Sequence, residues 1–183
     1  MQPIWFLVLA ALSFDAVADA KAGEKKAQLC MLCHKPGNAV AAVPLLEAQP
    51  AKYLVAATLA YKSGKRPDPA MQTNVARLSA RDIADIADYF ASKAPINAAS
   101  QAVDAAKVAA GESLARELKC AACHQTNYSG VDAVPRLAGQ TAGYLSAQLE
   151  AFASGRRMHP AAAMPSASGG DTENIAIYLS TLR

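Results

Sequence analysis

Two short stretches decide how this chain folds: CMLCH at residues 30–34 and CAACH at residues 120–124. Each has two cysteines three positions apart, followed directly by a histidine. The chain of 183 residues has only these four cysteines, and two of its three histidines belong to the same motifs. Nearly all of its thiol and imidazole groups therefore serve one kind of chemistry, and the chain uses that chemistry twice.

Covalent haem attachment is the chemistry that uses the whole string. The two thiols add to the haem vinyl groups as thioethers, and the adjacent histidine supplies an imidazole to the iron. Zinc sites space their ligands differently, and a thioredoxin-like redox pair requires a βαβ context that this sequence lacks. The motifs therefore predict two covalently bound haem c groups. We assign the thioether bonds to Cys30, Cys33, Cys120 and Cys123, and one axial position of each iron to His34 and His124.

The composition predicts helices around those haems. Apolar residues make up 52% of the chain and aromatic residues only 6%, and alanine is abundant. The sequence has no alternating β-branched runs bounded by hairpin turns. A domain of about 80 residues buries a thin core and often needs a metal or a covalent cofactor to stabilise it. We therefore expect an all-α protein with one haem in each of two small domains.

An internal repeat divides the chain. VPLLEAQPAKYLVAATLAYKSGKR, residues 43–66, matches VPRLAGQTAGYLSAQLEAFASGRR, residues 134–157. We expect a first haem domain over residues 21–95, a linker over 96–106 and a second haem domain over 107–183. Small residues stand four apart before each motif, which should let another helix approach closely. These residues are Gly23 with Ala27, and Gly111 with Ala115.

The first twenty residues have the features of an export signal. The apolar run IWFLVLAAL, residues 4–12, is too short to span a bilayer, and AVADA, residues 16–20, offers small residues for cleavage. No lysine or arginine precedes the apolar run, and an uncleaved anchor is the alternative. We expect a signal peptide over residues 1–20 and a product in the periplasm. Peripheral association with a membrane stays open.

The charge of the exported chain is mildly positive. The full chain has 18 basic and 15 acidic side chains, and cleavage after residue 20 removes two of the acidic ones, Asp15 and Asp19. This balance suits docking on an acidic protein surface and is too small to indicate nucleic-acid binding. Residues 21–95 carry 11 basic and 6 acidic side chains, against 7 and 6 in residues 107–183. The predicted docking lysines are Lys21, Lys25, Lys26, Lys62 and Lys65, and an ordinary solvated surface is the alternative.

The sixth iron ligand of the first haem follows by elimination. An electron carrier fills both axial positions, and the usual second ligand is methionine or histidine. Met1 leaves with the signal, and Met31 lies inside the first motif and cannot fold back over the other haem face. Met71 is then the only thioether available to the first half.

The second half offers three candidates: Met158, His159 and Met164. None of them aligns with Met71 without a gap. A four-residue deletion in the loop SASGGD, residues 166–171, would bring Met164 into line, and we favour it. Met158 and His159 remain the alternatives.

The sequence resembles the dihaem cytochromes c of the cytochrome c4 family over nearly all of its mature length. The resemblance rests on both CxxCH motifs, on VPLL and VPRLAGQ, on YKSGKR and FASGRR, and on MQTNVARLSARDIADIADYF at residues 71–90. It implies two tandem cytochrome c-like domains. It also implies that the carbonyls of Pro44 and Pro135 orient the proximal histidines. The first half departs from the family by having LLEAQ where LAGQ is usual, and the second by its shortened loop after Met164.

Two haems with filled coordination spheres make an electron-transfer protein, and no catalytic acid, base or nucleophile is expected. The main expectation is a periplasmic carrier between a donor complex and a terminal oxidase or reductase. One alternative is the dihaem cytochrome subunit of a dehydrogenase that oxidises sulfide or alcohols. A dihaem redox enzyme is the other, and it needs an open or displaceable ligand at one iron. Arg66 and Arg157 are expected to pair with haem propionates.

Overall fold

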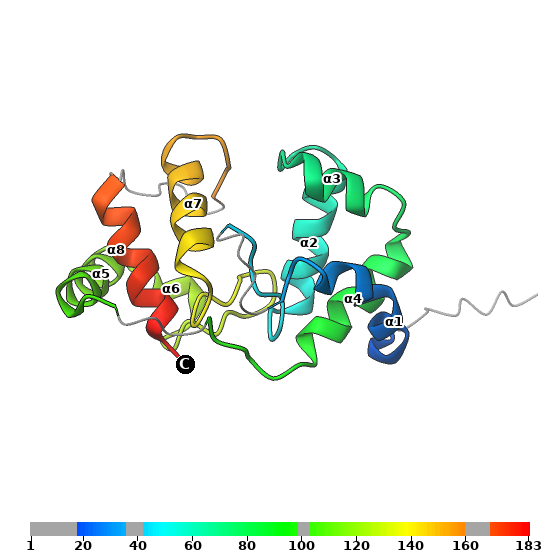
Figure 1. Cartoon of the computed structure of the whole chain (residues 1–183), viewed down its shortest axis with the longest axis horizontal. Coiled ribbons are helices and arrows are strands. Elements are labelled where there is room, and N and C mark those ends of the chain that lie inside the picture. The colour runs from blue at the N-terminus through cyan, green and yellow to red at the C-terminus, as the bar shows by residue number, and fades with distance from the viewer. Residues whose placement is uncertain (1–17, 36–41, 99–102, 160–168) are drawn as a thin grey trace, which may run out of the picture.

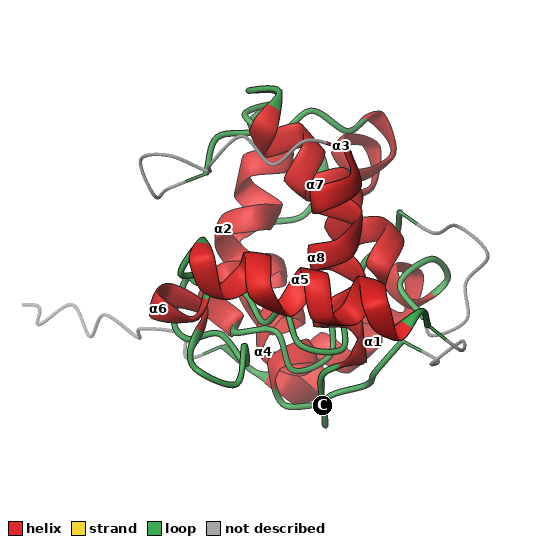
Figure 2. Ribbon diagram, turned by 90° about the vertical axis from the view of Figure 1, so that its left-hand side faces the viewer, coloured by secondary structure: helices red, strands yellow, loops and turns green. Residues whose placement is uncertain are grey.

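The fold is that of a computed structural model, which describes residues 18–35, 42–98, 103–159 and 169–183. These residues form eight helices, and the only β-type pairing among them is an isolated bridge between Val131 and Val134. The all-α prediction is confirmed (Figure 2). Within the described ranges, no helix has the length and apolar character needed to cross a membrane. The helices are α1 (Ala20–Met31), α2 (Ala51–Lys62), α3 (Pro69–Val75), α4 (Ala80–Ala91), α5 (Ala105–Glu117), α6 (Ala121–His124), α7 (Ala142–Ala153) and α8 (Gly169–Thr181).

The helices form two groups that lie side by side (Figure 1). In the first half α1 packs on α4, and α2 contacts both α3 and α4; in the second half α5 packs on α8, which also contacts α7. Helix α5 starts at Ala105, inside the segment expected to be a linker, because Asp104 caps it by accepting from the backbone N–H of Ala106 at 2.8 Å. Just before it, the N–H of Ala98 donates to the carbonyl of Gly139 at 2.8 Å. The connecting segment is therefore partly packed on the second half.

Glycine allows the closest helix contact in each half. A Cβ atom on Gly23 would collide with the carbonyl of Asp85 in α4, and one on Gly111 would collide with the carbonyl of Asn174 in α8. One turn later, Ala27 and Ala115 are fully buried in the same contacts. The predicted thin faces of α1 and α5 therefore lie against the last helix of their own half.

The ends of the helices in the first half follow local capping rules. Ser79 and Asp82 form a reciprocal capping box at the start of α4, as the spacing of these residues favours. Helix α4 then buries Ile83, Ala87 and Phe90 along one stripe. The capping therefore fixes where α4 starts, and the stripe fixes which face it turns to the core.

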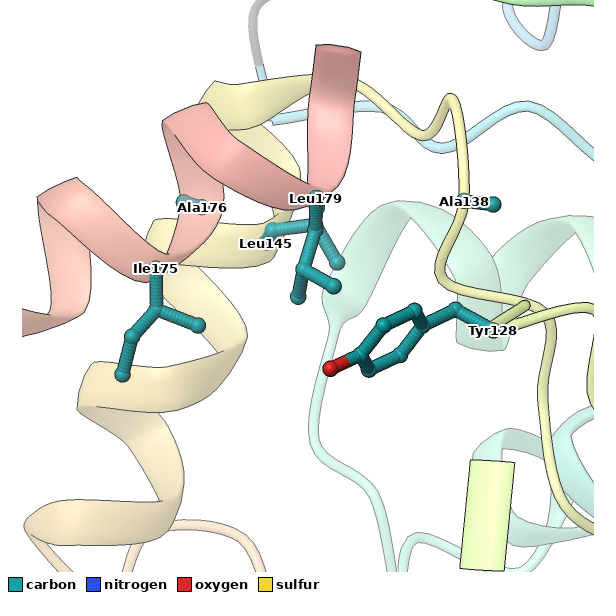
Figure 3. Packing of buried hydrophobic residues seen from close by; sticks show 6 residues of the cluster. All are labelled: Tyr128, Ala138, Leu145, Ile175, Ala176 and Leu179. Atoms are coloured by element: carbon teal, nitrogen blue, oxygen red, sulfur yellow. The ribbon is translucent and has the colours of Figure 1, made fainter. Parts of the chain in front are cut away.

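Each half has its own apolar core. In the second half the Tyr128 ring extends towards Leu179 of α8 (Figure 3). The six buried side chains of this cluster are Tyr128, Ala138, Leu145, Ile175, Ala176 and Leu179. The core of the first half is made of Ala27, Leu54, Ala87, Tyr89 and Phe90. Both clusters include partly buried cysteines of the motifs, Cys30 and Cys120, so each motif lies at the edge of a core.

Two glutamine side chains join the halves by a reciprocal exchange. Gln49 donates to the carbonyl of Arg136 at 2.8 Å and accepts from its N–H at 3.0 Å. Gln140 does the same to Leu45, with distances of 2.9 and 2.8 Å. Gln49 and Gln140 occupy matching positions of the repeat, and so do Leu45 and Arg136. Both amides are buried, so every polar atom in this exchange is satisfied across the boundary.

Replacing Gly111 by alanine should destabilise the protein, because the new methyl group would have to displace the α8 backbone. We expect a loss of about 1–3 kcal/mol in the free energy of unfolding, or more. Gly170→Ala is the matched control, since Gly170 lies exposed in the first turn of α8 and a Cβ there meets nothing within 4 Å. Denaturant unfolding of the haem-loaded protein measures both. Equal stability of the two variants would contradict the close contact between α5 and α8.

Candidate haem-binding sites

In both halves the motif forms a single helical turn. At the end of α1 the N–H of His34 donates to the carbonyl of Cys30 at 2.9 Å; in the second half the N–H of His124 donates to that of Cys120 at 3.1 Å. The two cysteines and the histidine of each motif therefore lie close together in space, as the spacing predicts. None of the four cysteines forms a disulfide. Burial raises the pKa of the Cys30 and Cys120 thiols.

A backbone carbonyl orients each motif histidine. Nδ1 of His34 lies 2.8 Å from the carbonyl oxygen of Pro44, and Nδ1 of His124 lies 2.8 Å from that of Pro135. A carbonyl can only accept, so the proton sits on Nδ1 and the Nε2 lone pair remains for a metal. Burial lowers the pKa of both rings, against the raising effect of the carbonyl, and this favours the neutral form. The residues of both motifs therefore fit covalent haem with an imidazole bound to iron.

Helix α3 carries Met71, the candidate distal ligand of the first half. Asp68 caps this helix by accepting from the N–H of Met71 at 2.9 Å, and Pro69 occupies its first position. Asp68 is also near enough to His34 to raise its pKa, though by less than burial lowers it. The carboxylate at the start of α3 therefore lies within electrostatic reach of the proximal histidine.

Of the three candidate distal ligands in the second half, the structure describes Met158 and His159. The side chain of Met158 is 85% exposed and points into solvent. The ring centroid of His159 lies 6.4 Å from that of His124 and 4.9 Å from that of Phe152. Met164 lies outside the described residues. Among the candidates that the structure describes, only His159 is close to the proximal histidine.

Two arginines meet between the halves. Arg66 donates to the hydroxyl of Tyr144 at 2.9 Å and to Oε1 of Gln148 at 2.7 Å; Arg157 donates to the same Oε1 at 2.6 Å. Arg66 is 8% exposed, although it belongs to the first half and both its acceptors belong to the second. Within the described ranges neither guanidinium forms an ion pair with a carboxylate. An anionic partner would therefore compensate charges that no carboxylate of the described residues balances.

The aromatic residues beside these arginines repeat between the halves. The guanidinium of Arg66 lies 4.5 Å from the centroid of the Tyr61 ring, and that of Arg157 lies 4.6 Å from the centroid of Phe152. These cation–π contacts pack each guanidinium against the aromatic residue at the matching position of its own half. The repeat pairs Arg66 with Arg157, but only the structure shows that they share Gln148 as an acceptor.

Sequence reasoning missed the burial of Glu47. Its side chain is 5% exposed, and Oε2 has no hydrogen-bond partner among the described residues. It acts on the nearby His34 by raising its pKa, in opposition to burial. The only signal in the sequence was the departure LLEAQ, where the second half has Ala138 at the matching position.

Comparisons with known proteins find chains that are similar in sequence and in fold. The family model for cytochrome c matches residues 108–183. Cytochrome c4 of Azotobacter vinelandii is 36% identical over 162 residues, which cover 78% of this chain and 76% of that protein. The crystal structure of reduced recombinant cytochrome c4 from Pseudomonas stutzeri superposes with a TM-score of 0.79 at 29% identity, covering 91% of this chain and 100% of the other.

A thiosulfate-linked protein is also similar. The thiosulfate dehydrogenase electron acceptor of Thiomonas intermedia is 31% identical over 160 residues, which cover 81% of this chain and 74% of that protein. Its similarity extends across both halves, as does that of the Azotobacter protein. The duplicated plan therefore occurs in relatives with more than one recorded role.

Proposed function

Because this chain belongs to the cytochrome c4 family, whose members are electron-transfer proteins with two haem c groups, we propose that it is a periplasmic carrier between a donor complex and a terminal oxidase or reductase. It is an electron-transfer protein rather than an enzyme. The observation that carries the proposal is the duplicated site, in which each motif histidine is bonded through Nδ1 to a proline carbonyl at 2.8 Å. A covalently bound haem with both axial positions filled supplies a one-electron ferric/ferrous couple.

We assign the residues as the motifs predict. Cys30 and Cys33 hold the first haem, and His34 and Met71 bind its iron. The proline carbonyl fixes the His34 ring, and the Asp68 cap fixes the start of the helix that presents Met71. A thioether ligand favours ferrous iron and raises the reduction potential. For the second haem the corresponding residues are Cys120, Cys123 and His124, with Met164 as the ligand of its ferrous iron.

The arginine pair gives the two haems a shared environment. We propose that Arg66 and Arg157 bind haem propionates, since a buried and a half-buried cation converge on one neutral amide and an anion nearby would balance their charge. Arg66 reaches across the boundary to Tyr144 and Gln148, so its charge acts on both halves. The guanidinium charges stabilise the reduced form of each haem relative to the oxidised form, which has one more positive charge.

Only some of the five lysines predicted to dock a partner protein are available to do so. Lys26 is paired with Asp82 and Asp85 at 2.7 and 2.6 Å, and Lys62 donates to two backbone carbonyls just before α4. These two lysines are therefore engaged within the protein. Within the part of the chain that the structure describes, the predicted docking lysines that stay exposed without such bonds are Lys21, Lys25 and Lys65.

The second candidate function is that of an electron acceptor for a dehydrogenase. The observation that favours it is the similarity to the electron acceptor of a thiosulfate dehydrogenase over 81% of this chain. The same two haem sites serve either role, because only the donor differs. Co-purification with a larger catalytic chain would favour the dehydrogenase role over the free carrier.

Replacing Met71 by alanine should remove the distal ligand from one iron of the haem-loaded protein. The unaltered protein should show two one-electron couples in a spectroelectrochemical titration, with no spectral change when carbon monoxide is added to the reduced form. In Met71→Ala one haem should bind carbon monoxide, and its potential should fall because the thioether is lost. Met158→Ala is the control, since that side chain is 85% exposed. A Met71→Ala protein indifferent to carbon monoxide would contradict the assignment.

Arg66→Gln should lower both reduction potentials. Removal of a buried unit charge close to both haems should shift each couple by some tens of millivolts, the order expected at an effective dielectric constant of about 20. Lys65→Gln removes the same charge from the adjacent exposed position, where solvent screens it, and should leave both couples nearly unchanged. If Arg66→Gln leaves the second couple where it was, the arginine does not act across the boundary.

A further inference from the structure

The position of His159 carries an inference about the second haem. Two imidazole rings bound to one metal ion from opposite sides, each through a bond of about 2.0–2.1 Å to nitrogen, have ring centroids roughly 6.3 Å apart. The centroids of His124 and His159 are 6.4 Å apart. The spacing of the two rings is therefore that of a pair with one metal ion between them.

Neighbouring contacts hold the His159 ring in this place. Phe152 of α7 meets it edge to face, with an interplanar angle of 89° and a centroid distance of 4.9 Å. Arg157 covers the Phe152 ring at 4.6 Å and is itself bonded to Gln148. Met158 turns the opposite way, into solvent. The chain therefore directs the imidazole inward at a position where its neighbour points outward.

The first half has no equivalent of this ring. Two residues after the matching arginine it has Asp68, which caps α3 and cannot supply an imidazole. The two halves therefore differ at this position, as they do at Glu47 and Ala138, while they share the motif and the proline carbonyl. Thioether ligation favours ferrous iron, so a nitrogen ligand competes best in the ferric state.

We propose that His159 is the sixth ligand of the second haem iron in its ferric state. The proposal rests on the proposed attachment of haem to the second motif. In the ferric protein the first haem then has one histidine and one methionine ligand, and the second has two histidines. The chain would thus carry two chemically different couples on one repeated scaffold.

Ferric spectra of the haem-loaded protein test this. Ferric haem bound by a thioether has a weak absorption band at the red end of the spectrum, which haem with two imidazole ligands lacks. The unaltered protein should show this band at the intensity of one haem, and Met71→Ala should lose it entirely. His159→Asn should alter the ferric spectrum of the other haem, whereas Met158→Ala, at the exposed neighbouring position, should alter neither. Haem content and helical circular dichroism verify that each variant is folded.

The possible results separate the two proposals. The His159 assignment would be overturned if Met71→Ala kept the band and His159→Asn had the same spectrum as the unaltered protein. The proposed role as an electron carrier would be unaffected by that result. Absence of the band from the unaltered protein would instead refute Met71 ligation, and the His159→Asn spectrum would still decide the role of His159.

A separate observation concerns the start of the folded chain. The carboxylate of Asp19 caps α1 by accepting from the N–H groups of Lys21 and Ala22 at 2.8 and 3.3 Å. The N–H of Asp19 donates to Oδ1 of Asp85 at 2.9 Å. Cleavage after residue 20 would remove the cap, the first residue of α1 and one of the donors to Asp85.

Asp85 is a buried carboxylate that accepts several hydrogen bonds. It is 1% exposed and also accepts from Lys26 at 2.6 Å and from Arg81 at 2.8 Å. A chain that starts at Asp19 would place a charged amino group at the atom that now donates to Asp85, which strengthens that bond. The residues directly before it, Ala16, Val17 and Ala18, have the small-x-small pattern of a signal cleavage site.

We infer that the export signal is removed between Ala18 and Asp19, so that Asp19 is the amino terminus of the mature protein. The intact mass of the haem-loaded protein recovered from the periplasm tests this inference. The expected mass is that of residues 19–183 with two haems, and Ala18→Leu should block processing while Ala20→Leu should not. A product starting at residue 21, or the reverse response of the two variants, would overturn it.

Discussion

The hydrogen bond from each proximal histidine to a proline carbonyl is the constraint on which the rest of the structure depends. It sets which imidazole nitrogen is free for iron, and it ties the end of the motif helix to the loop that follows. The residue after Pro44 is Leu45, whose backbone is held by Gln140 of the other half. The same loop therefore orients a ligand and joins the two halves, so the geometry of the haem site and the interface cannot vary independently.

Much of the fold and of the first site could be predicted from local sequence. The cysteine motifs and the Ser79 capping box are short-range signals, and the repeat is visible in the sequence itself. The helices occur at the positions that these signals indicate. The meeting of Arg66 with Gln148 could not be predicted, because it joins residues 82 positions apart whose side-chain directions depend on how the halves pack. The second distal ligand was also open, since the loop after His159 has no gap-free counterpart in the first half.

The two halves share a backbone plan and differ in polarity. At matching positions the first half buries Glu47 and the second buries Ala138. The next residue has a positive φ in both halves, 56° at Ala48 and 67° at Gly139. The turn was therefore retained while the side chains changed, so two sites of one shape present different electrostatic surroundings to their haems.

The reciprocal glutamine exchange has a consequence for the origin of the architecture. Gln49 of the first half contacts Arg136 of the second. The residues that match these two in the repeat, Gln140 and Leu45, contact each other in the same way. This reciprocity is the rule of an isologous two-fold interface. One repeat unit thus carries both faces of the contact. The chain has the internal symmetry of a homodimer whose subunits share one backbone, and that connection holds the two redox centres at a fixed ratio and at an effective concentration that no dilution can lower.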